Sequence, residues 1–595
     1  MLVVLVASSA ALLYVLRSYG LLIYDDGFSV YPVVRMLEGG LLYRDIYHYY
    51  APLSYHLLEI VFTLTGPSLL SARTLWMLFL LGSIAGSYRI ARRFAPPATA
   101  WLPAATYALV PGPWHKAFYG LCIVSFLLAL ARALERSSPA RHLQLGAVCG
   151  VVLMVRQELG LAQFLVAAAI VGIVPVWPLR WQNLGRTAVA TGMRRVLLVF
   201  SGFAAAVAPV FAYYAAQENL GNLIDAVFRQ AIQYSSRPPT PFLRFVLPGG
   251  FGNAAEGAGV GALLLVPLAF GPLAAGFLVR AIRARGLDVR NALAAALVVL
   301  LVPAAAQSFN PPLLVRFLQS AICFYLLIPF VLGELSQRTR GPATLFAGLS
   351  LAFGVVFVIG GPQQVLPSDA YIGSMRSLRY SAPVQVMGDE FFTDESLANE
   401  IRLVQAFIAE HTQPDEPIFT APLHSIYYLL LDRPNPTAYL GDFPGLNLAM
   451  SGQRKRTEMQ RLLASEARYA VVDRAWWAAW FGRTTPIRSA VFAAFVPVRL
   501  YGSVAILERD SSSERLGMRK IARRIWQHRT RPGDADALRK ILRNWPDEPV
   551  PHELLGELLF EQRKFRAAAA SLEAASRLDP ANPRLQVQLD RARNQ

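Results

Sequence analysis

Apolar residues form long runs through the first 361 residues of the chain and shorter patterns after that. The runs measure roughly 17–25 residues, which is long enough for a helix to cross a bilayer. They predict about eleven membrane-spanning helices, near residues 1–22, 72–90, 97–111, 118–134, 143–155, 160–178, 196–215, 259–279, 291–306, 316–333 and 342–361. The pattern therefore predicts a polytopic α-helical membrane protein over residues 1–361.

Two apolar stretches require a separate interpretation. The run 53–66 is short and contains His56 and Glu59, which favours a helix at the membrane interface over a span. The first run contains Ala-Ser-Ser-Ala at residues 7–10, as a cleaved signal peptide would, but it lacks a basic start and many spans follow. We therefore expect it to be retained as a span.

Charged residues divide between alternate loops. One set of loops carries Arg89, Arg92, Arg93, Arg132, Arg136, Arg141, Arg180, Arg186, Arg194, Arg195, Arg280, Arg283, Arg285, Arg290, Arg338 and Arg340. The opposite set carries Asp25, Asp26, Glu38, Asp45, Glu158, Glu218, Asp225 and Glu256. Because cytoplasmic loops are rich in Lys and Arg, this predicts a plasma (inner) membrane protein with its N-terminus inside and its C-terminal part on the periplasmic or external face. The same distribution accounts for the net charge of +18, so no nucleic-acid partner is expected.

The chain after residue 361 has the pattern of soluble structure. Residues 396–411 predict an amphipathic helix, and the runs 417–421, 469–473 and 495–507 predict short strands. Together they predict an extracytoplasmic α/β domain over residues 362–510.

The last segment, 511–595, predicts a helical tail. Small and apolar residues at helix–turn–helix spacing match a tetratricopeptide repeat, namely Leu555, Gly556, Leu559, Phe565, Ala568, Leu572, Ala575 and Pro580. An ordinary helical hairpin is the alternative to this repeat. The preceding stretch 516–546 could be a second, degenerate repeat. Because one repeat cannot bury its own face, we expect the tail to pack on a neighbouring part or on a protein partner.

The loop after the first span holds the strongest candidate chemistry. Asp25 and Asp26 are adjacent carboxylates at a membrane surface, where they repel each other and are costly to desolvate. We interpret both as catalytic, with a carboxylate acting as general base on an acceptor hydroxyl or stabilising positive charge on a sugar ring. The alternative is a helix cap, and Asp26 in particular could do only that. Further substrate-binding candidates in this loop are Arg35, Tyr43, Asp45, His48 and Tyr50.

Other outer-face candidates are sparse. They are His115, Lys116, Arg156, Glu158 and Arg316. An arginine beside apolar helices suits a phosphate partner, because guanidinium binds phosphate oxygens with paired hydrogen bonds. An interfacial anchor is the alternative for Arg316, and a simple ion pair with Glu158 is the alternative for Arg156.

Metal and redox chemistry is not indicated. Cys122, Cys149 and Cys323 all lie in apolar runs without CxxC spacing, and the sequence has no HExxH, GxSxG or phosphate-cradling P-loop motif. No cofactor is required by the predicted chemistry, although Asp25 and Asp26 could coordinate a divalent metal.

With these residues in place, the sequence resembles the GT-C glycosyltransferases, most closely the bacterial relatives of protein O-mannosyltransferases and of the lipid A aminoarabinose transferase. The specific part is the acidic pair followed by RMLEGGLLYRDIYHYYAPLSYHLLEIVFTLTG at residues 35–66. Further similar segments are Ser71-Ala72-Arg73, Tyr88-Arg89-Ile90-Ala91-Arg92 and Arg156-Gln157-Glu158-Leu159-Gly160. The resemblance covers roughly residues 1–360, and more loosely the α/β domain.

The resemblance implies a GT-C-like fold and transfer of a sugar from a polyprenyl-phosphate carrier, with inversion, to a glycan, lipid or protein acceptor on the outer face. It implies that Asp25 is the catalytic residue, that Asp26 is the second carboxylate, and that Arg156 and Arg316 hold the carrier phosphate. The second outer loop departs from the family pattern, because it reads Pro-Gly-Pro-Trp-His-Lys where relatives often have an acidic residue. His115 could replace that residue. A transporter of a lipid-linked glycan and an inactive membrane scaffold remain the alternative functions.

Overall fold

The computed structural model describes most of the chain. The described residues are 2–21, 23, 25–109, 114–174, 186–230, 232, 271–308, 314–336, 380–421, 425–438, 452–474, 491, 493–510, 515–526 and 530–595. The backbone divides into two compact units, Met1–Leu21 with Tyr50–Arg379 and Leu22–Tyr49 with Tyr380–Gln595. The predicted domain limits, after residues 361 and 510, border or fall within segments outside the described residues, so they remain predictions.

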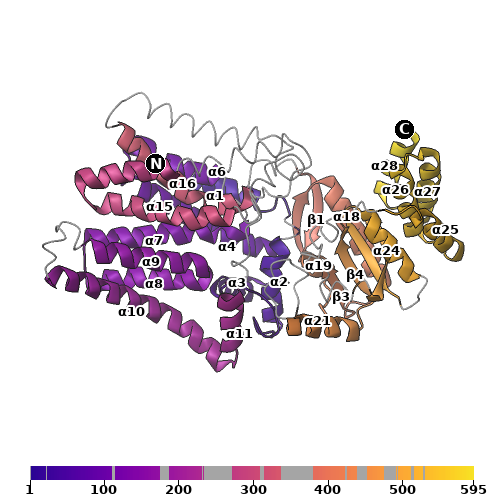
Figure 1. Cartoon of the computed structure of the whole chain (residues 1–595), viewed down its shortest axis with the longest axis horizontal. Helices are drawn as coiled ribbons and strands as arrows, with labels where there is room; N and C mark the ends of the chain where they lie inside the picture. The colour runs from indigo at the N-terminus through magenta and orange to yellow at the C-terminus, as the bar shows by residue number, and fades with distance from the viewer. Residues whose placement is uncertain are drawn as a thin grey trace. The chain divides into compact units, whose positions relative to one another are not determined.

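The described residues of the first unit form helices (Figure 1). These are α1 Leu2–Leu16, α3 Leu53–Thr65, α4 Leu69–Ala91, α5 Pro97–Ala100, α6 Leu102–Leu109, η1 Trp114–Lys116, α7 Phe118–Glu135, α8 Pro139–Val155, α9 Gln157–Ile173, α10 Arg186–Ala216, α11 Leu220–Ile224, η3 Asp225–Arg229, α15 Val289–Ser308 and α16 Leu314–Ser336. Residues 271–285 are also helical.

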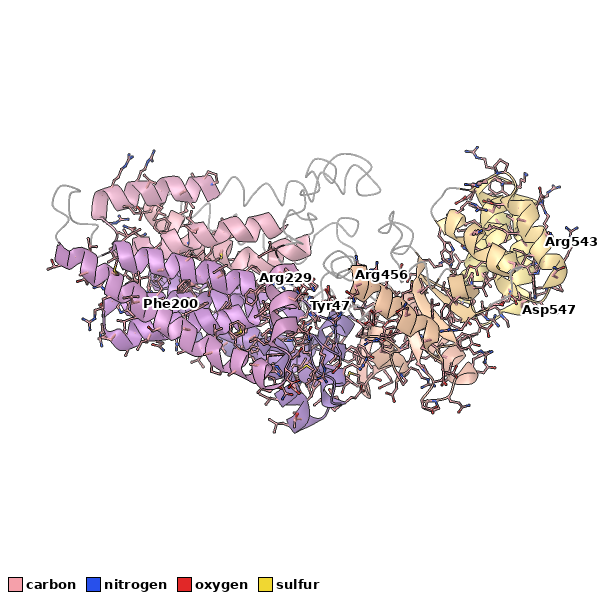
Figure 2. The ribbon with its side chains drawn as sticks, turned by 60° about the horizontal axis from the view of Figure 1, so that its bottom comes forward. Tyr47, Phe200, Arg229, Arg456, Arg543 and Asp547 are labelled. Carbon is pink, nitrogen blue, oxygen red and sulfur yellow. The ribbon has the colours of Figure 1, made fainter. Side chains whose placement is uncertain are left out.

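Three segments among the described residues are long and apolar enough to cross a membrane, namely Leu69–Ala91, Trp114–Glu135 and Thr187–Ala216. The third carries exposed apolar side chains, including Leu197 at 59% and Phe200 at 54% exposed, the latter labelled in Figure 2. Exposed apolar helix faces of this kind are satisfied by lipid rather than by water. The chain is therefore an integral membrane protein; its orientation remains a prediction.

Each predicted span with described residues contains a helix, although α1 ends at Leu16 and residues 17–21 of the span 1–22 are not helical. The span 97–111 is divided into α5 and α6, because Pro103 has no N–H to continue the helix from the preceding turn. The span 259–279 is described only from residue 271, and the span 342–361 lies outside the described residues. The packing of α8 on α10 is close, since a Cβ on Gly146 would lie 1.8 Å from the Val199 carbonyl oxygen.

The second unit contains a four-stranded mixed sheet in the order β3-β4-β6-β5. Its strands are β3 Ile418–Ala421, β4 Tyr469–Asp473, β5 Phe495–Tyr501 and β6 Val504–Arg509. β3 runs parallel to β4, and the other pairs are antiparallel, with Val471 opposite Ile506. Every residue of β3 and β4 is buried, as expected for strands covered on both faces.

Other elements of this unit are α2 Asp25–Leu37, α18 Glu395–His411, α19 Ile426–Leu431, α21 Gly452–Ala464 and the hairpin of β1 Ala382–Val386 with β2 Asp389–Thr393. The predicted helix 396–411 and the predicted strands 417–421 and 469–473 are confirmed. The run 495–507 is a hairpin of two strands instead of one, because Gly502, with φ of 55°, turns the chain inside the apolar run.

The tail consists of α24 Arg515–Trp526, α25 Asp534–Asn544, α26 Pro549–Glu561, α27 Phe565–Leu578 and α28 Pro583–Arg593. Each helix packs on the next one, and α24 and α26 also pack on β5. Gly556 permits the close contact of α26 with α27, because a Cβ there would lie 2.6 Å from Leu572 Cγ. The hairpin α26–α27 thus packs on the rest of the tail and on the sheet, as expected for a repeat that cannot bury its own face. The assignment of this hairpin as a tetratricopeptide repeat remains a prediction.

Candidate functional site

The acidic pair lies in the first turn of α2, in the second unit. Free backbone N–H groups and the helix dipole favour negative charge at this position. The Asp26 side chain is completely buried and Asp25 is half-buried. Asp25 is therefore the more accessible of the two carboxylates, and the burial of Asp26 fits a supporting position as well as the predicted cap.

Helix α2 is fixed by α19 at very short range. A Cβ on Gly27 would lie 2.1 Å from the Ile426 backbone nitrogen, so only glycine permits this approach. One turn further along α2, Tyr31 also contacts α19, because its ring stacks on that of Tyr428 with the ring centroids 4.6 Å apart. Burial raises the pKa of Tyr31 to about 12, although the nearby Arg35 guanidinium acts in the opposite direction. The acidic pair is thus carried by a helix whose position the C-terminal α/β part determines.

The rest of the first loop forms a tight turn. Tyr43 has a φ of 74° and donates its N–H to the Ile46 carbonyl at 2.7 Å. Asp45 accepts the Leu41 N–H at 3.0 Å and pairs with Arg44 at 3.0 Å. Burial opposes ionisation of Asp45, but the hydrogen bonds from Arg44 and the Leu41 N–H, together with the charge of Arg44, outweigh it and lower the pKa of Asp45. These contacts give Tyr43 and Asp45 a role in shaping the turn.

Helix α21 holds this turn from outside the loop. Arg454 donates to the carbonyl oxygens of Tyr43 and Arg44, both at 3.1 Å, and its guanidinium lies 4.6 Å from the centre of the Tyr47 ring. Tyr47 in turn donates its N–H to the Ala438 carbonyl at 2.9 Å. These contacts join residues about 400 positions apart in the sequence, and nothing in the local pattern indicated them.

His48 is completely buried beside the helix that carries the acidic pair. Its Nδ1 accepts the Tyr49 N–H at 3.0 Å, and its ring lies 4.5 Å from the ring of Phe28. His48 thus packs against the first turns of α2. Arg35, in the last turn of α2, pairs with Glu38 at 3.4 Å.

A second group of predicted residues lies together in the first unit, and we call Tyr50, Lys116, Tyr119, Arg156 and Glu158 the basic cluster. Lys116 Nζ lies 3.3 Å from the Tyr50 hydroxyl and 4.6 Å from its ring centre. The Arg156 guanidinium lies 4.0 Å from the Tyr50 ring centre and 5.5 Å from that of Tyr119. Arg156 forms an ion pair with Glu158, which also accepts the Tyr119 hydroxyl at 3.3 Å. Tyr119 was not predicted as a site residue, since it lies inside an apolar run.

The basic cluster carries excess positive charge at a poorly hydrated position. The cluster contains two cations, Lys116 and Arg156, and one carboxylate, Glu158, which pairs with Arg156. Arg156 occupies the junction between α8 and α9, and its side chain is 13% exposed. Its Nη1 is buried and has no hydrogen-bond acceptor in the part of the chain that the structure describes. A phosphate group would satisfy both the charge and the donor. His115, in the same 3-10 turn as Lys116, is buried.

Two buried polar residues position the chain around the first loop. Arg73 on α4 is fully buried and donates to the carbonyl oxygens of Arg17 at 2.8 Å, Tyr19 at 3.3 Å and Gly20 at 2.7 Å. Gln157 accepts the Ala51 N–H at 3.3 Å. Arg73 was detectable as a lone charge in an apolar run, yet no sequence pattern indicated its acceptors.

The remaining predictions concern Arg316 and metal binding. Arg316 lies in α16, and its side chain is outside the described residues. Within the described ranges, no group of three or more His, Cys, Asp or Glu side chains is arranged to hold a metal ion.

Comparison with protein families and with curated sequences gives no match. Solved structures do match. ArnT from Cupriavidus metallidurans in the apo state is 15% identical, with a TM-score of 0.50 over 86% of this chain and 98% of that one. The same protein bound to undecaprenyl phosphate is 14% identical, with a TM-score of 0.49 over the same shares. The apo oligosaccharyltransferase from Archaeoglobus fulgidus is 12% identical, with a TM-score of 0.42 over 86% of this chain and 74% of that one.

At these identities the comparison concerns the fold alone. The match to apo ArnT extends over nearly the whole of that protein, so it includes both the apolar helices and the α/β part that follows them. The fold of the chain is therefore similar to that of ArnT and resembles the GT-C membrane glycosyltransferases.

Proposed function

We propose that this chain is an inverting GT-C glycosyltransferase that moves a sugar from a polyprenyl-phosphate carrier to an acceptor hydroxyl. The acceptor is a glycan, lipid or protein on the outer face of the plasma (inner) membrane, where Asp25 and the C-terminal part are proposed to lie. No additional cofactor takes part in this scheme.

The observation that carries the proposal is the basic cluster. Its buried guanidinium, at Arg156, has a donor that no described residue accepts, and Lys116 adds a second positive charge beside Tyr50. A membrane-embedded chain retains such charge where an anion binds. Undecaprenyl phosphate, which is bound in one structure of ArnT, has the required anionic head and an apolar tail suited to a lipid-facing site.

The chemistry is a single displacement. Asp25 removes the proton from the acceptor hydroxyl, whose oxygen forms a bond to the anomeric carbon of the sugar. The bond between that carbon and the phosphate oxygen breaks on the opposite side, which inverts the anomeric configuration. The electron pair remains on the polyprenyl phosphate, where Arg156 and Lys116 stabilise the negative charge. Asp26 is proposed as the second carboxylate, which supports Asp25 from a buried position.

The test measures sugar transfer in membranes supplied with a panel of radiolabelled undecaprenyl-phosphate monosaccharides. Asp25→Asn should abolish the labelled product while protein level stays unchanged, and Asp415→Asn, at an exposed site in the same unit, should transfer as wild type does. Equal product from Asp25→Asn and wild type would remove Asp25 as the base. Absence of product from all proteins with every donor would favour a transporter or a scaffold.

Carrier recognition is tested separately by the binding of undecaprenyl phosphate to purified protein. Arg156→Gln should weaken binding about tenfold or more, since it removes a charge-assisted contact. The matched control is Arg229→Gln, because Arg229 is 70% exposed and pairs only with Asp225 among the ion pairs of the described residues. Equal loss in both variants would point to non-specific attraction.

A further inference from the structure

A cavity of about 400 Å³ lies in the second unit, between the helical tail and the sheet. Its apolar wall consists of Ile525 and Trp526 from α24, Phe560 from α26 and Leu572 from α27. A volume of this size falls within the range of small-molecule sites, which combine apolar walls with few polar groups. None of these residues belongs to the proposed transferase site.

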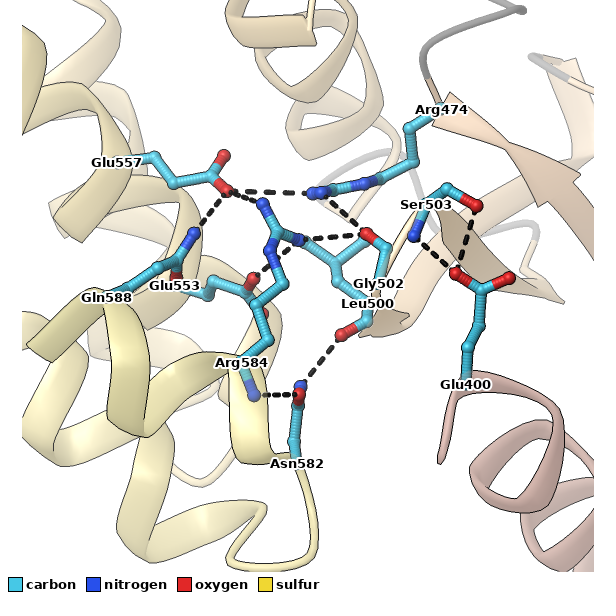
Figure 3. A network of polar contacts seen from close by, with 10 residues as sticks. All are labelled: Glu400, Arg474, Leu500, Gly502, Ser503, Glu553, Glu557, Asn582, Arg584 and Gln588. Carbon is cyan, nitrogen blue, oxygen red and sulfur yellow. Dashed lines mark hydrogen bonds and ion pairs between the residues drawn. The ribbon is translucent and has the colours of Figure 1, made fainter. Parts of the chain in front are cut away.

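A network of charged side chains borders the cavity (Figure 3). Arg584 pairs with Glu553 at 3.2 Å and with Glu557 at 2.6 Å. Gln588 Nε2 donates to Glu557 at 3.0 Å. Arg474, at the end of β4, donates to the Gly502 carbonyl at 3.0 Å, and its Nη1 lies 3.6 Å from Glu557.

Among the described residues, three buried polar atoms of cavity-lining side chains have neither a hydrogen bond nor an ion pair. Two are donors, Arg474 Nε and Trp526 Nε1, and the third is an acceptor, Gln588 Oε1. Buried polar groups in proteins are nearly always paired, so each unpaired group requires an explanation. Two donors and one acceptor beside an apolar wall would be satisfied by a ligand that has hydrogen-bond acceptors, one donor and an apolar group.

We propose that this cavity binds the C-terminal residue of a peptide that ends in an apolar side chain. The terminal carboxylate accepts from Arg474 and Trp526. The apolar side chain packs between Trp526, Phe560 and Leu572. The backbone N–H of the same residue donates to Gln588 Oε1. The shared chemistry is an N-acylated apolar amino acid with a free carboxylate.

The charges that face the cavity favour an anion. The bases are Arg474, Arg584 and the exposed Arg591. The acids are Glu557 and the exposed Glu561, and Glu553 pairs with Arg584 beside them. Burial raises the pKa of Glu553, whereas Arg474 and Arg584 overcome the burial of Glu557 and lower its pKa. Three arginines thus line the cavity against two lining carboxylates, which leaves positive charge in excess.

A sugar fits this cavity less well than a peptide end. Sugars present many hydroxyl groups and require a correspondingly polar wall, whereas this wall is largely apolar with three polar atoms to satisfy. The inference does not rest on the proposed transferase activity, because it is tested by binding alone.

The experiment uses the full-length protein purified in detergent and calorimetric titration with acetyl-Ala-Leu as the free acid and as the C-terminal amide. The acid should bind, and the amide should bind about tenfold more weakly or worse, since it lacks the charge-assisted hydrogen bonds. Acetyl-leucine tests whether the cavity recognises a peptide end or only a single N-acylated amino acid. Tighter binding of the dipeptide supports a peptide end, and equal or tighter binding of acetyl-leucine overturns it.

Two variants and one control locate the site. Trp526→Phe keeps an aromatic ring but removes the donor, so it should weaken binding of the acid several-fold and leave the amide unchanged. Arg474→Gln should remove the preference for the acid. Trp545→Phe, at the end of α25 and away from the cavity, should bind as wild type does. If Arg474→Gln fails to fold, Trp526→Phe still decides the test. Equal affinity for acid and amide, or no binding at millimolar concentration, would overturn the proposal.

Discussion

Replacement of Gly27 by alanine tests whether the C-terminal part positions the acidic pair. The added Cβ would lie 2.1 Å from the Ile426 nitrogen, 2.5 Å from the Ile426 Cα and 2.7 Å from the Ser425 carbonyl carbon. All three are backbone atoms, so no side-chain rotation relieves the overlap. Either α2 or α19 must move, and α2 carries Asp25 and Asp26 in the turn that contains Gly27.

Two opposing effects set the size of the stability change caused by Gly27→Ala. Alanine favours a helix over glycine by at most about 1 kcal/mol. Overpacking against a rigid neighbour costs about 1–3 kcal/mol, so we expect a net loss of about 1–2 kcal/mol in the free energy of unfolding of the second unit. A shift of about 1 Å in a catalytic group can reduce the rate about a hundredfold. The loss of transfer rate should therefore be much greater than the loss of stability.

The assay compares the initial transfer rate, per amount of folded protein, with the thermal unfolding midpoint in detergent. Gly517→Ala is the matched control, because a Cβ at this helical glycine of the same unit has no heavy atom within 4 Å. That variant should be as active as wild type and slightly more stable. If Gly27→Ala retained both wild-type rate and wild-type midpoint, the close contact of α2 with α19 would be refuted.

Three further outcomes are expected. Arg73→Met should reduce the yield of folded protein, because it removes three hydrogen bonds of a buried guanidinium to the chain after α1, each worth about 1–3 kcal/mol; comparable yield by size-exclusion chromatography would contradict this. Arg454→Gln should slow transfer about tenfold with a stability change of about 1 kcal/mol, whereas Arg456→Gln, exposed on the same helix, should do neither. Hydrogen bonds from Arg524 and from the Arg531 N–H outweigh burial and lower the pKa of Asp534 in the folded protein. Asp534 should therefore contribute stability above its unfolded pKa of about 4, and this contribution should be lost as the pH falls through the lower pKa of the folded state. Denaturant midpoints at pH 7 and pH 3 should thus differ less in Asp534→Asn than in wild type.

Elements with a strong local pattern were predictable from the sequence. The helix predicted at 396–411 begins after Asp394, whose side chain accepts the Leu397 N–H at 3.0 Å, and ends at His411. The strand Tyr469–Asp473 was predicted at its observed limits because a continuous apolar run is bounded by polar residues. The hairpin of β1 and β2 was missed, since its strands of five residues each are too short to establish a period.

The arrangement of the candidate site was predictable only in part. The sequence singled out the acidic pair and Arg156, because each is a charge that membrane spanning does not require. It did not show that residues 22–49 belong to the same compact unit as residues 380–595. That grouping depends on contacts such as the one between Arg454 and the Tyr43 carbonyl, and sequence periodicity reports only on neighbours along the chain.

The contacts within the first loop show which of its polar side chains hold the turn together. Asp45 is committed to the Leu41 N–H and to Arg44, and His48 is committed to the Tyr49 N–H and the Phe28 ring. Such side chains cannot bind a substrate without giving up contacts that hold the turn. Asp25 is half-buried at a helix start, where backbone groups favour its charged form. Conservative substitutions at Asp45 and His48 should therefore alter stability and rate together, whereas substitution of Asp25 should alter the rate alone.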